Sequence, residues 1–88
     1  MSQPLVSVII PTYNSEKTLP LCLESIKRQT YKSIEVIVVD NFSTDRTVDI
    51  AKSYGAKIIQ ERAERSKAKN IGLRIAKGQY ILLSLIHI

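Results

Sequence analysis

The sequence is poor in the residues that build disulfide frameworks and zinc sites. Its 88 residues include one cysteine, Cys22, and one histidine, His87. One cysteine cannot form an intramolecular disulfide, and one of each cannot form a Cys/His zinc cluster. The lone histidine also leaves a serine hydrolase without a base, and no Gly-x-Ser-x-Gly motif is present. These absences suit a protein of a reducing compartment or a fold that does not depend on redox conditions.

Glycine is also scarce, and its positions exclude two common nucleotide sites. The three glycines are Gly55, Gly72 and Gly78, and none follows the first apolar segment. The Gly-x-Gly-x-x-Gly dinucleotide fingerprint is therefore absent. No glycine is followed by Lys-Ser or Lys-Thr, so there is no P-loop.

Long apolar runs are missing as well. No stretch approaches the roughly 20 apolar residues that span a bilayer, and the N-terminus lacks the layout of a signal peptide. We therefore expect no membrane segment in this chain and a cytoplasmic location.

The net charge of +5 is unevenly distributed. Residues 1–56 carry six basic and six acidic side chains, whereas residues 57–79 carry seven basic and two acidic ones. Such an excess attracts phosphate groups, although a solvated helix face is the simpler explanation. Base-stacking aromatics are not interleaved with these cations, so we expect no nucleic-acid partner.

The apolar pattern predicts alternating strands and helices. Short β-branched or apolar runs predict strands at 6–10, 34–39, 57–60 and 80–83, and helical spacing predicts three intervening helices. The helices are expected from 17 or 18 to 29, from a cap at Ser43 or Thr44 to 54, and over 66–77, with Asp45 in the first turn of the second. Gly55 and Gly78 are expected as left-handed helix ends. The fold class is α/β with a parallel sheet, because strands separated by a helix form βαβ units.

In such sheets, ligands bind beyond the carboxyl ends of the strands. This rule points to Pro11–Asn14 after the first strand and Asp40–Ser43 after the second. The carboxylate of Asp40 can accept hydrogen bonds from a base or a ribose, and the ring of Tyr13 can stack on a base. A turn or cap role for Asp40, and an Asx turn for Asn14, are the alternatives.

Several blocks together resemble one family. They are Val6–Asn14, Leu23–Ile26, Gln29–Tyr31, Glu35–Asp45, Ala68–Leu73 and Ala76–Ile81. In this order, over most of residues 5–83, they resemble the opening of family 2 glycosyltransferases. The resemblance implies a Rossmann-like N-terminal half of a GT-A fold, with about four strands and three helices. Residues 1–83 would then be the part that binds a nucleoside-diphosphate sugar.

The resemblance also implies roles for individual residues. The set expected to bind the nucleotide sugar is Pro11, Thr12, Tyr13, Asn14, Asp40, Asn41 and Lys69. Asp40 would bond the base, usually uracil, and Lys69 would approach the nucleotide from the third helix in place of an arginine. Asn41 stands where the family often has a second aspartate, and Phe42 where it often has glycine.

After a strand like 80–83, the family has an Asp-x-Asp motif that holds a divalent metal. Here Ser-Leu-Ile-His-Ile follows at 84–88, so we expect no metal site and no catalytic residue in this chain. Mg²⁺ or Mn²⁺ is expected in the full-length enzyme, where it would offset charge on the leaving diphosphate. Residues 83–88 match the translation of a common sequencing adaptor, which makes 84–88 a non-native tail by hypothesis.

The expected function is therefore that of an N-terminal piece of a glycosyltransferase. The parent enzyme would transfer a sugar from a UDP-sugar to an acceptor hydroxyl with inversion, and the piece alone would be inactive. The full-length enzyme could work at the cytoplasmic face of the membrane. The alternatives are a non-enzymatic nucleotide-binding or interaction module of the doubly wound type, and a small flavodoxin-like domain.

Overall fold

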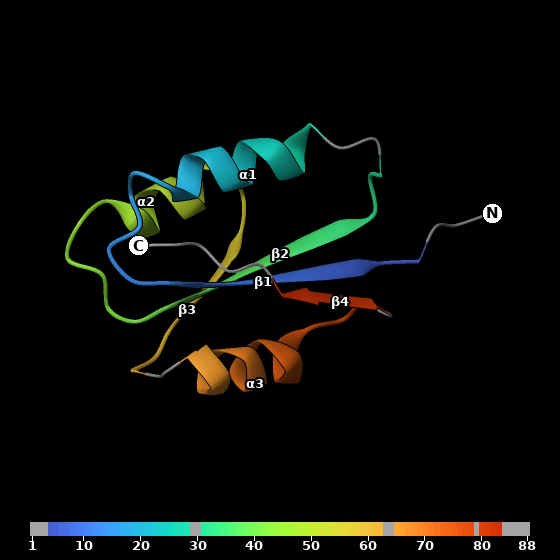
Figure 1. The fold of residues 1–88 in the computed structure, drawn as a ribbon. Helices are drawn as coiled ribbons and strands as arrows, with labels where there is room; N and C mark the ends of the chain where they lie inside the picture. Colours follow the sequence, from blue (N-terminus) through green and yellow to red (C-terminus); the bar gives the residue numbers. More distant parts are fainter. Residues whose placement is uncertain (1–3, 29–30, 63–64, 79, 84–88) are drawn as a thin grey trace.

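The computed structural model describes residues 4–28, 31–62, 65–78 and 80–83 (Figure 1). Four strands and three helices alternate along this part of the chain. The strands are β1 (Val6–Thr12), β2 (Ile34–Asp40), β3 (Lys57–Gln60) and β4 (Tyr80–Leu83). The helices are α1 (Leu19–Lys27), α2 (Thr47–Ser53) and α3 (Arg65–Ile75). The alternation predicted from the sequence is confirmed.

All four strands are parallel and lie in the order β3-β2-β1-β4. The chain thus builds outward from β1 through β2 to β3 and then returns to place β4 on the other side of β1. Helices α1 and α2 cover one face of the sheet, and α3 covers the other (Figure 1). The strand order therefore reverses at β1, where a doubly wound sheet leaves a crevice for ligands.

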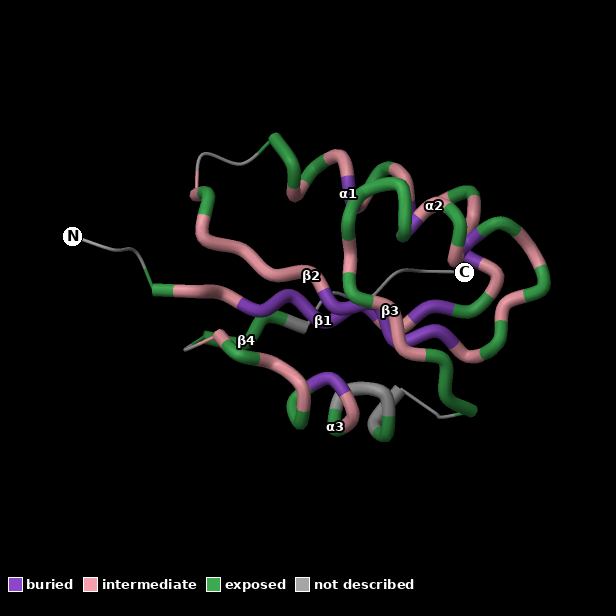
Figure 2. Tube along the Cα trace, turned by 180° about the vertical axis from the view of Figure 1, so that it is seen from behind, coloured by how far each residue is buried: buried purple, intermediate pink, exposed green. Residues whose placement is uncertain are grey.

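The core has two halves because successive residues of a strand point to opposite faces. On the side of α1 and α2, Val8, Ile10 and Val38 pack with residues of both helices. On the side of α3, Ile9 and Ile37 pack with apolar residues of that helix. The continuous apolar runs of β1 and β2 are explained by this burial on both faces (Figure 2). Among the described residues, no helix has the length and apolarity that a bilayer crossing requires.

The start of α2 differs from the expectation. The helix begins at Thr47, so neither Ser43 nor Thr44 caps it, and Asp45 precedes its first turn. Ser43 lies four residues before the first residue of α2, and its hydroxyl instead donates a hydrogen bond to the carboxylate of Asp40. The cap predicted for the second helix is therefore wrong, because Ser43 and Thr44 form hydrogen bonds with Asp40 and Asn14 instead of with the first turn of α2.

Two glycines were expected to end helices, and only one does so in the way proposed. Gly55 has a φ of 77°, the left-handed conformation expected after α2, whereas Gly78 has no positive φ. A side chain at Gly78 would instead meet the backbone of β1, because a Cβ there would lie 2.7 Å from the backbone nitrogen of Ser7. Glycine is therefore required at position 78 because the chain there passes too close to β1 to leave room for a side chain.

Glu35 joins three strands at the end of the sheet away from the predicted site. Its carboxylate accepts hydrogen bonds from the Ser7 hydroxyl (2.6 Å), the Lys57 ammonium (2.7 Å) and the Lys77 N–H (2.9 Å). The Lys57 and Ser7 side chains and the Lys77 amide lower the pKa of Glu35 from 4.5 to about 2. The side chain is only 10% exposed, so solvent screens this cluster partly.

This lowered pKa predicts a pH-dependent stability. The folded carboxylate resists protonation more than the unfolded one, so its contribution is complete above about pH 5 and is lost as the pH falls toward 2. We expect Glu35→Gln to lower the free energy of unfolding at pH 7 by on the order of 2 kcal/mol. The difference from the unmutated chain should disappear near pH 2. Urea unfolding across this pH range measures it, with Asp49→Asn at an exposed carboxylate as the control; an effect constant with pH would contradict the assignment.

Candidate functional site

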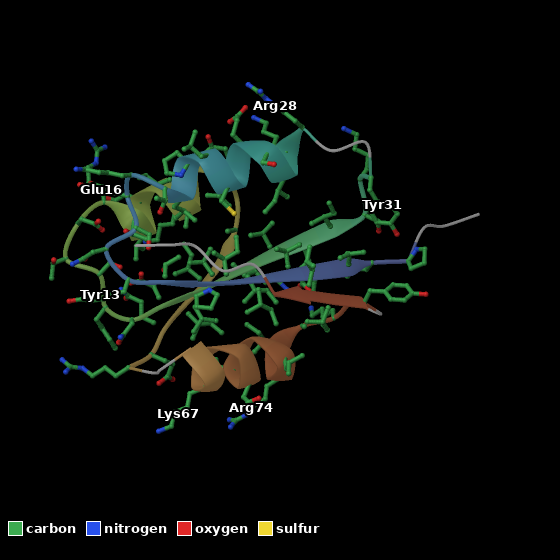
Figure 3. All side chains as sticks on the ribbon, in the orientation of Figure 1. Tyr13, Glu16, Arg28, Tyr31, Lys67 and Arg74 are labelled. Carbon is green, nitrogen blue, oxygen red and sulfur yellow. The ribbon has the colours of Figure 1, made fainter. Side chains whose placement is uncertain are left out.

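The candidate site lies where β1 and β2 end side by side. The last paired residues of these strands are Thr12 and Asp40, which are register partners. Beyond them, the N–H of Asn41 donates to the carbonyl of Thr12 at 2.9 Å, so the two segments leave the sheet together. Tyr13, labelled in Figure 3, lies at this end of the sheet.

Asp40 is fully buried beneath the two loops, with 0% of its surface exposed. Its carboxylate accepts hydrogen bonds from the hydroxyl of Thr12 (2.7 Å), the N–H of Ser43 (2.8 Å), the hydroxyl of Ser43 (2.5 Å) and the amide of Gln60 (3.4 Å). These donors come from β1, from the loop after β2 and from β3. The turn role that the sequence left open for Asp40 is therefore the one that its contacts show.

Asn14 makes a second connection between the loops. Its N–H donates to the hydroxyl of Ser43 at 2.8 Å, and its side-chain oxygen accepts the N–H of Thr44 at 2.8 Å. Its φ of 46° is left-handed, a conformation that asparagine tolerates better than most residues. The side chain thus bonds the neighbouring loop, about 30 residues away in sequence, where the sequence had suggested a local Asx turn.

A third connection involves residues that the sequence did not single out for this role. The hydroxyl of Thr47, the first residue of α2, accepts the N–H of Ser15 at 2.8 Å. Asp45 accepts the N–H of Glu16 at 3.2 Å and that of Thr47 at 2.9 Å. Burial alone would raise the pKa of Asp45, but the hydrogen bonds from Thr47 and Glu16 outweigh it and lower the pKa. The sequence signal for this connection is the high proportion of hydroxyl and carboxyl side chains over residues 43–47, which can accept hydrogen bonds from a neighbouring loop.

The loops leave some of the candidate side chains accessible. Tyr13 is 46% exposed, Asn41 is half-buried, and Phe42, beside it, is also 46% exposed. Pro11 is half-buried within β1, and it lies beyond the described pairing of β1 with β4, which runs from Val6 to Ile9. The structure therefore brings the predicted residues of β1 and β2 to one edge of the sheet, where Tyr13 is exposed, Asn41 is half-buried and Asp40 is buried.

Lys69 belongs to α3, but its side chain lies outside the described residues. Nearby cations are described: a shallow basic depression is lined by Glu61, Arg62, Lys67, Asn70, Ile71 and Arg74. Lys67 and Arg74 project from α3 on the side away from the sheet (Figure 3). The larger pocket, about 540 Å³, lies between α1 and the first residues of β2 and includes none of the predicted site residues.

Metal ligands do not gather in the part of the chain that the structure describes. No group of three or more histidine, cysteine, aspartate or glutamate residues there could hold an ion. Residues 84–88, where the family's Asp-x-Asp would begin and where the non-native tail was inferred, lie outside the described residues.

Comparisons with known proteins identify relatives of this chain and proteins of similar fold. Residues 7–84 match the family model described as glycosyl transferase family 2. The chain is 37% identical over 86 residues to glycosyltransferase GlyG of Streptococcus pneumoniae, covering 90% of this chain and 29% of that protein. It is 45% identical over 80 residues to an uncharacterized glycosyltransferase of Rickettsia typhi, covering 88% of this chain and 25% of the relative. The chain thus spans about a quarter of these relatives.

Solved structures give the same result. The crystal structure of S. aureus TarS 1-349 in complex with UDP-GlcNAc has a TM-score of 0.84 and 36% identity, covering 92% of this chain and 26% of that one. The mannosyltransferase PcManGT of Pyrobaculum calidifontis, in complex with GDP-Man and Mn²⁺, has a TM-score of 0.84 and 30% identity, covering 97% of this chain and 28% of that one.

Proposed function

Because the chain belongs to glycosyl transferase family 2 and has the N-terminal architecture of the GT-A fold, we propose that it holds the nucleoside of a sugar donor at the ends of β1 and β2. The observation that carries the proposal is the joining of the two loops through Asp40, Ser43 and Asn14. Loops held by partly buried hydrogen bonds keep a fixed spacing, which a planar ligand between exposed side chains requires.

The donor is a UDP-sugar under this proposal. The support comes from TarS, whose structure with UDP-GlcNAc shares 36% of its aligned residues with this chain. The Pyrobaculum enzyme, which has the same TM-score, was solved with GDP-Man, so structural similarity alone does not select the base. We choose UDP because TarS is 36% identical to this chain and the Pyrobaculum enzyme is 30% identical. The full-length enzyme would transfer the sugar to an acceptor hydroxyl, with inversion, using a metal held by residues beyond those described.

The residues have separate roles in the proposal. Tyr13 flanks the base, and Asn41 offers its amide to the edge of the base. Asp40 would have to give up hydrogen bonds from Ser43 and Gln60 to reach a ligand, so it acts chiefly by holding the loop. Cations on and near α3, Lys69 among them, attract the diphosphate. The cytoplasmic location stays a prediction.

A titration tests this assignment. We expect UDP to shift the backbone NMR signals of residues 12–14 and 40–43 in the 88-residue chain, and Tyr13→Ala to weaken binding about tenfold because a stacking ring is lost. The control is Tyr54→Ala, which removes an exposed tyrosine beside the other pocket. Equal losses in both variants, or shifts confined to the pocket at α1, would contradict the proposal. Binding of FMN without any response to UDP or GDP would favour the flavodoxin-like alternative.

A further inference from the structure

Phe42 has a backbone conformation that aromatic residues rarely adopt. Its φ is 49°, in the left-handed region, where a Cβ crowds the following carbonyl oxygen. Glycine avoids this crowding, and asparagine tolerates it better. The chain nevertheless places a large aromatic side chain at this position of the loop after β2.

The ring is held in place and yet accessible. The N–H and hydroxyl of the next residue, Ser43, are bonded to the buried carboxylate of Asp40, which fixes the loop. The guanidinium of Arg62, just beyond β3, lies 5.6 Å from the centre of the Phe42 ring. Phe42 as a whole remains 46% exposed despite this contact.

Phe42 and Tyr13 come from neighbouring strands at the same edge. Thr12 and Asp40 are register partners at the ends of the two strands. Tyr13 comes directly after Thr12, and Phe42 comes two residues after Asp40. Asn14 and Ser43, the residues next to these rings, are bonded to each other through the Asn14 N–H. Tyr13 and Phe42, both exposed, therefore belong to two loops that this hydrogen bond joins, and Asn41, which precedes Phe42, is partly accessible.

From this arrangement we propose that Phe42, backed by Arg62, is a second aromatic contact for the donor's base and that it raises nucleotide affinity without selecting the base. The inference rests on the proposed function, because it needs a nucleoside at this edge. Every base has a π-face, so a stacking ring contributes similarly to uracil and guanine. The left-handed φ is a conformational strain that a contact with ligand would explain, whereas an incidental surface ring would leave it without a use.

The variant Phe42→Gly separates ligand binding from folding. It removes the ring and relieves the φ, so we expect its melting temperature to be equal to or higher than that of the unmutated chain. We expect its affinities for UDP and GDP to fall by the same factor, about tenfold. Phe42→Ala should lose the same affinity while keeping the strained φ, and Arg62→Ala should lose about twofold through the missing cation–π contact. NMR titration and thermal unfolding by circular dichroism supply the two readouts.

Leu21→Ala is the matched control, because Leu21 is an exposed apolar residue of α1, and its affinities should not change. If the unmutated chain binds UDP or GDP and Phe42→Gly binds equally well, the inference is wrong and the proposed function stands. If the unmutated chain binds neither nucleotide, both fail. A fall in melting temperature without a fall in affinity would make Phe42 a structural residue, and a loss confined to one nucleotide would overturn base-tolerant stacking.

Discussion

Replacing Gly78 with alanine is expected to remove a large part of the stability of this chain. A Cβ at this position would lie 2.5 Å from the hydroxyl oxygen of Ser7, 2.7 Å from its backbone nitrogen and 2.8 Å from the carbonyl oxygen of Leu5. Two of these atoms are backbone at the start of β1, so a rotamer change cannot relieve the contact. The segment before β4 would have to move away and lose the hydrogen bond from the Gly78 N–H to Ser7.

We expect a loss of about 3 kcal/mol in the free energy of unfolding. A domain of this size has on the order of 5–10 kcal/mol in total, so the melting temperature should fall sharply. Gly55→Ala is the matched control: its φ of 77° is strained for alanine, but no atom lies within 4 Å of the new Cβ. That variant should lose about 1 kcal/mol. Equal losses in a urea titration would show that the contact with β1 is relieved without disturbing the sheet.

The layers of the fold could be predicted because they depend on local pattern. The apolar runs of β1 and β2 have no polar face, which requires cover on both sides, and the helices between strands require parallel pairing. The position of β4 beside β1 could not be predicted in the same way. It depends on contacts between segments about 74 residues apart, such as Val6 with Tyr80, and no local signal specifies which edge a strand joins.

The beginning of α2 shows why polar residues are hard to assign from sequence. Ser43 and Thr44 are residue types that favour helix caps, so the sequence predicts them at the start of the helix. The same oxygen and nitrogen atoms can bond a neighbouring loop, and here they bond Asp40 and Asn14. The competing partner, Asn14, is about 30 residues away, so only the folded chain reveals it.

The sequence predicts the position of the candidate site more directly than it predicts the role of each residue there. The rule that ligands bind beyond the carboxyl ends of parallel strands led directly to the loops after β1 and β2. The rule does not say which side chain faces the ligand. Asp40 is fully buried whereas Asn41, the next residue, is partly accessible, and successive residues at the end of a strand point in opposite directions.

The second large effect is expected at Asp40. Asp40→Ala removes the acceptor of four hydrogen bonds inside the loops and leaves the Thr12 hydroxyl and the Ser43 N–H without it. Buried donors without a partner are costly, so we expect the free energy of unfolding to fall by about 3 kcal/mol. Asp40→Asn keeps one acceptor oxygen but turns an amide group toward the other donors, and should lose about half as much.

Binding distinguishes support of the loop from direct contact with a ligand. Asn41 follows Asp40 and is partly accessible. Asn41→Ala should keep its stability, because the backbone N–H that bonds Thr12 is unchanged. It should lose UDP affinity, because the side-chain amide proposed to contact the base is removed. Asp40→Ala should lose stability first, and its affinity should recover in part when the folded state is favoured by a stabilising osmolyte. A folded Asp40→Ala variant with unchanged stability and no UDP binding would instead place the carboxylate against the nucleoside. Urea unfolding and NMR titration of both variants decide between these outcomes.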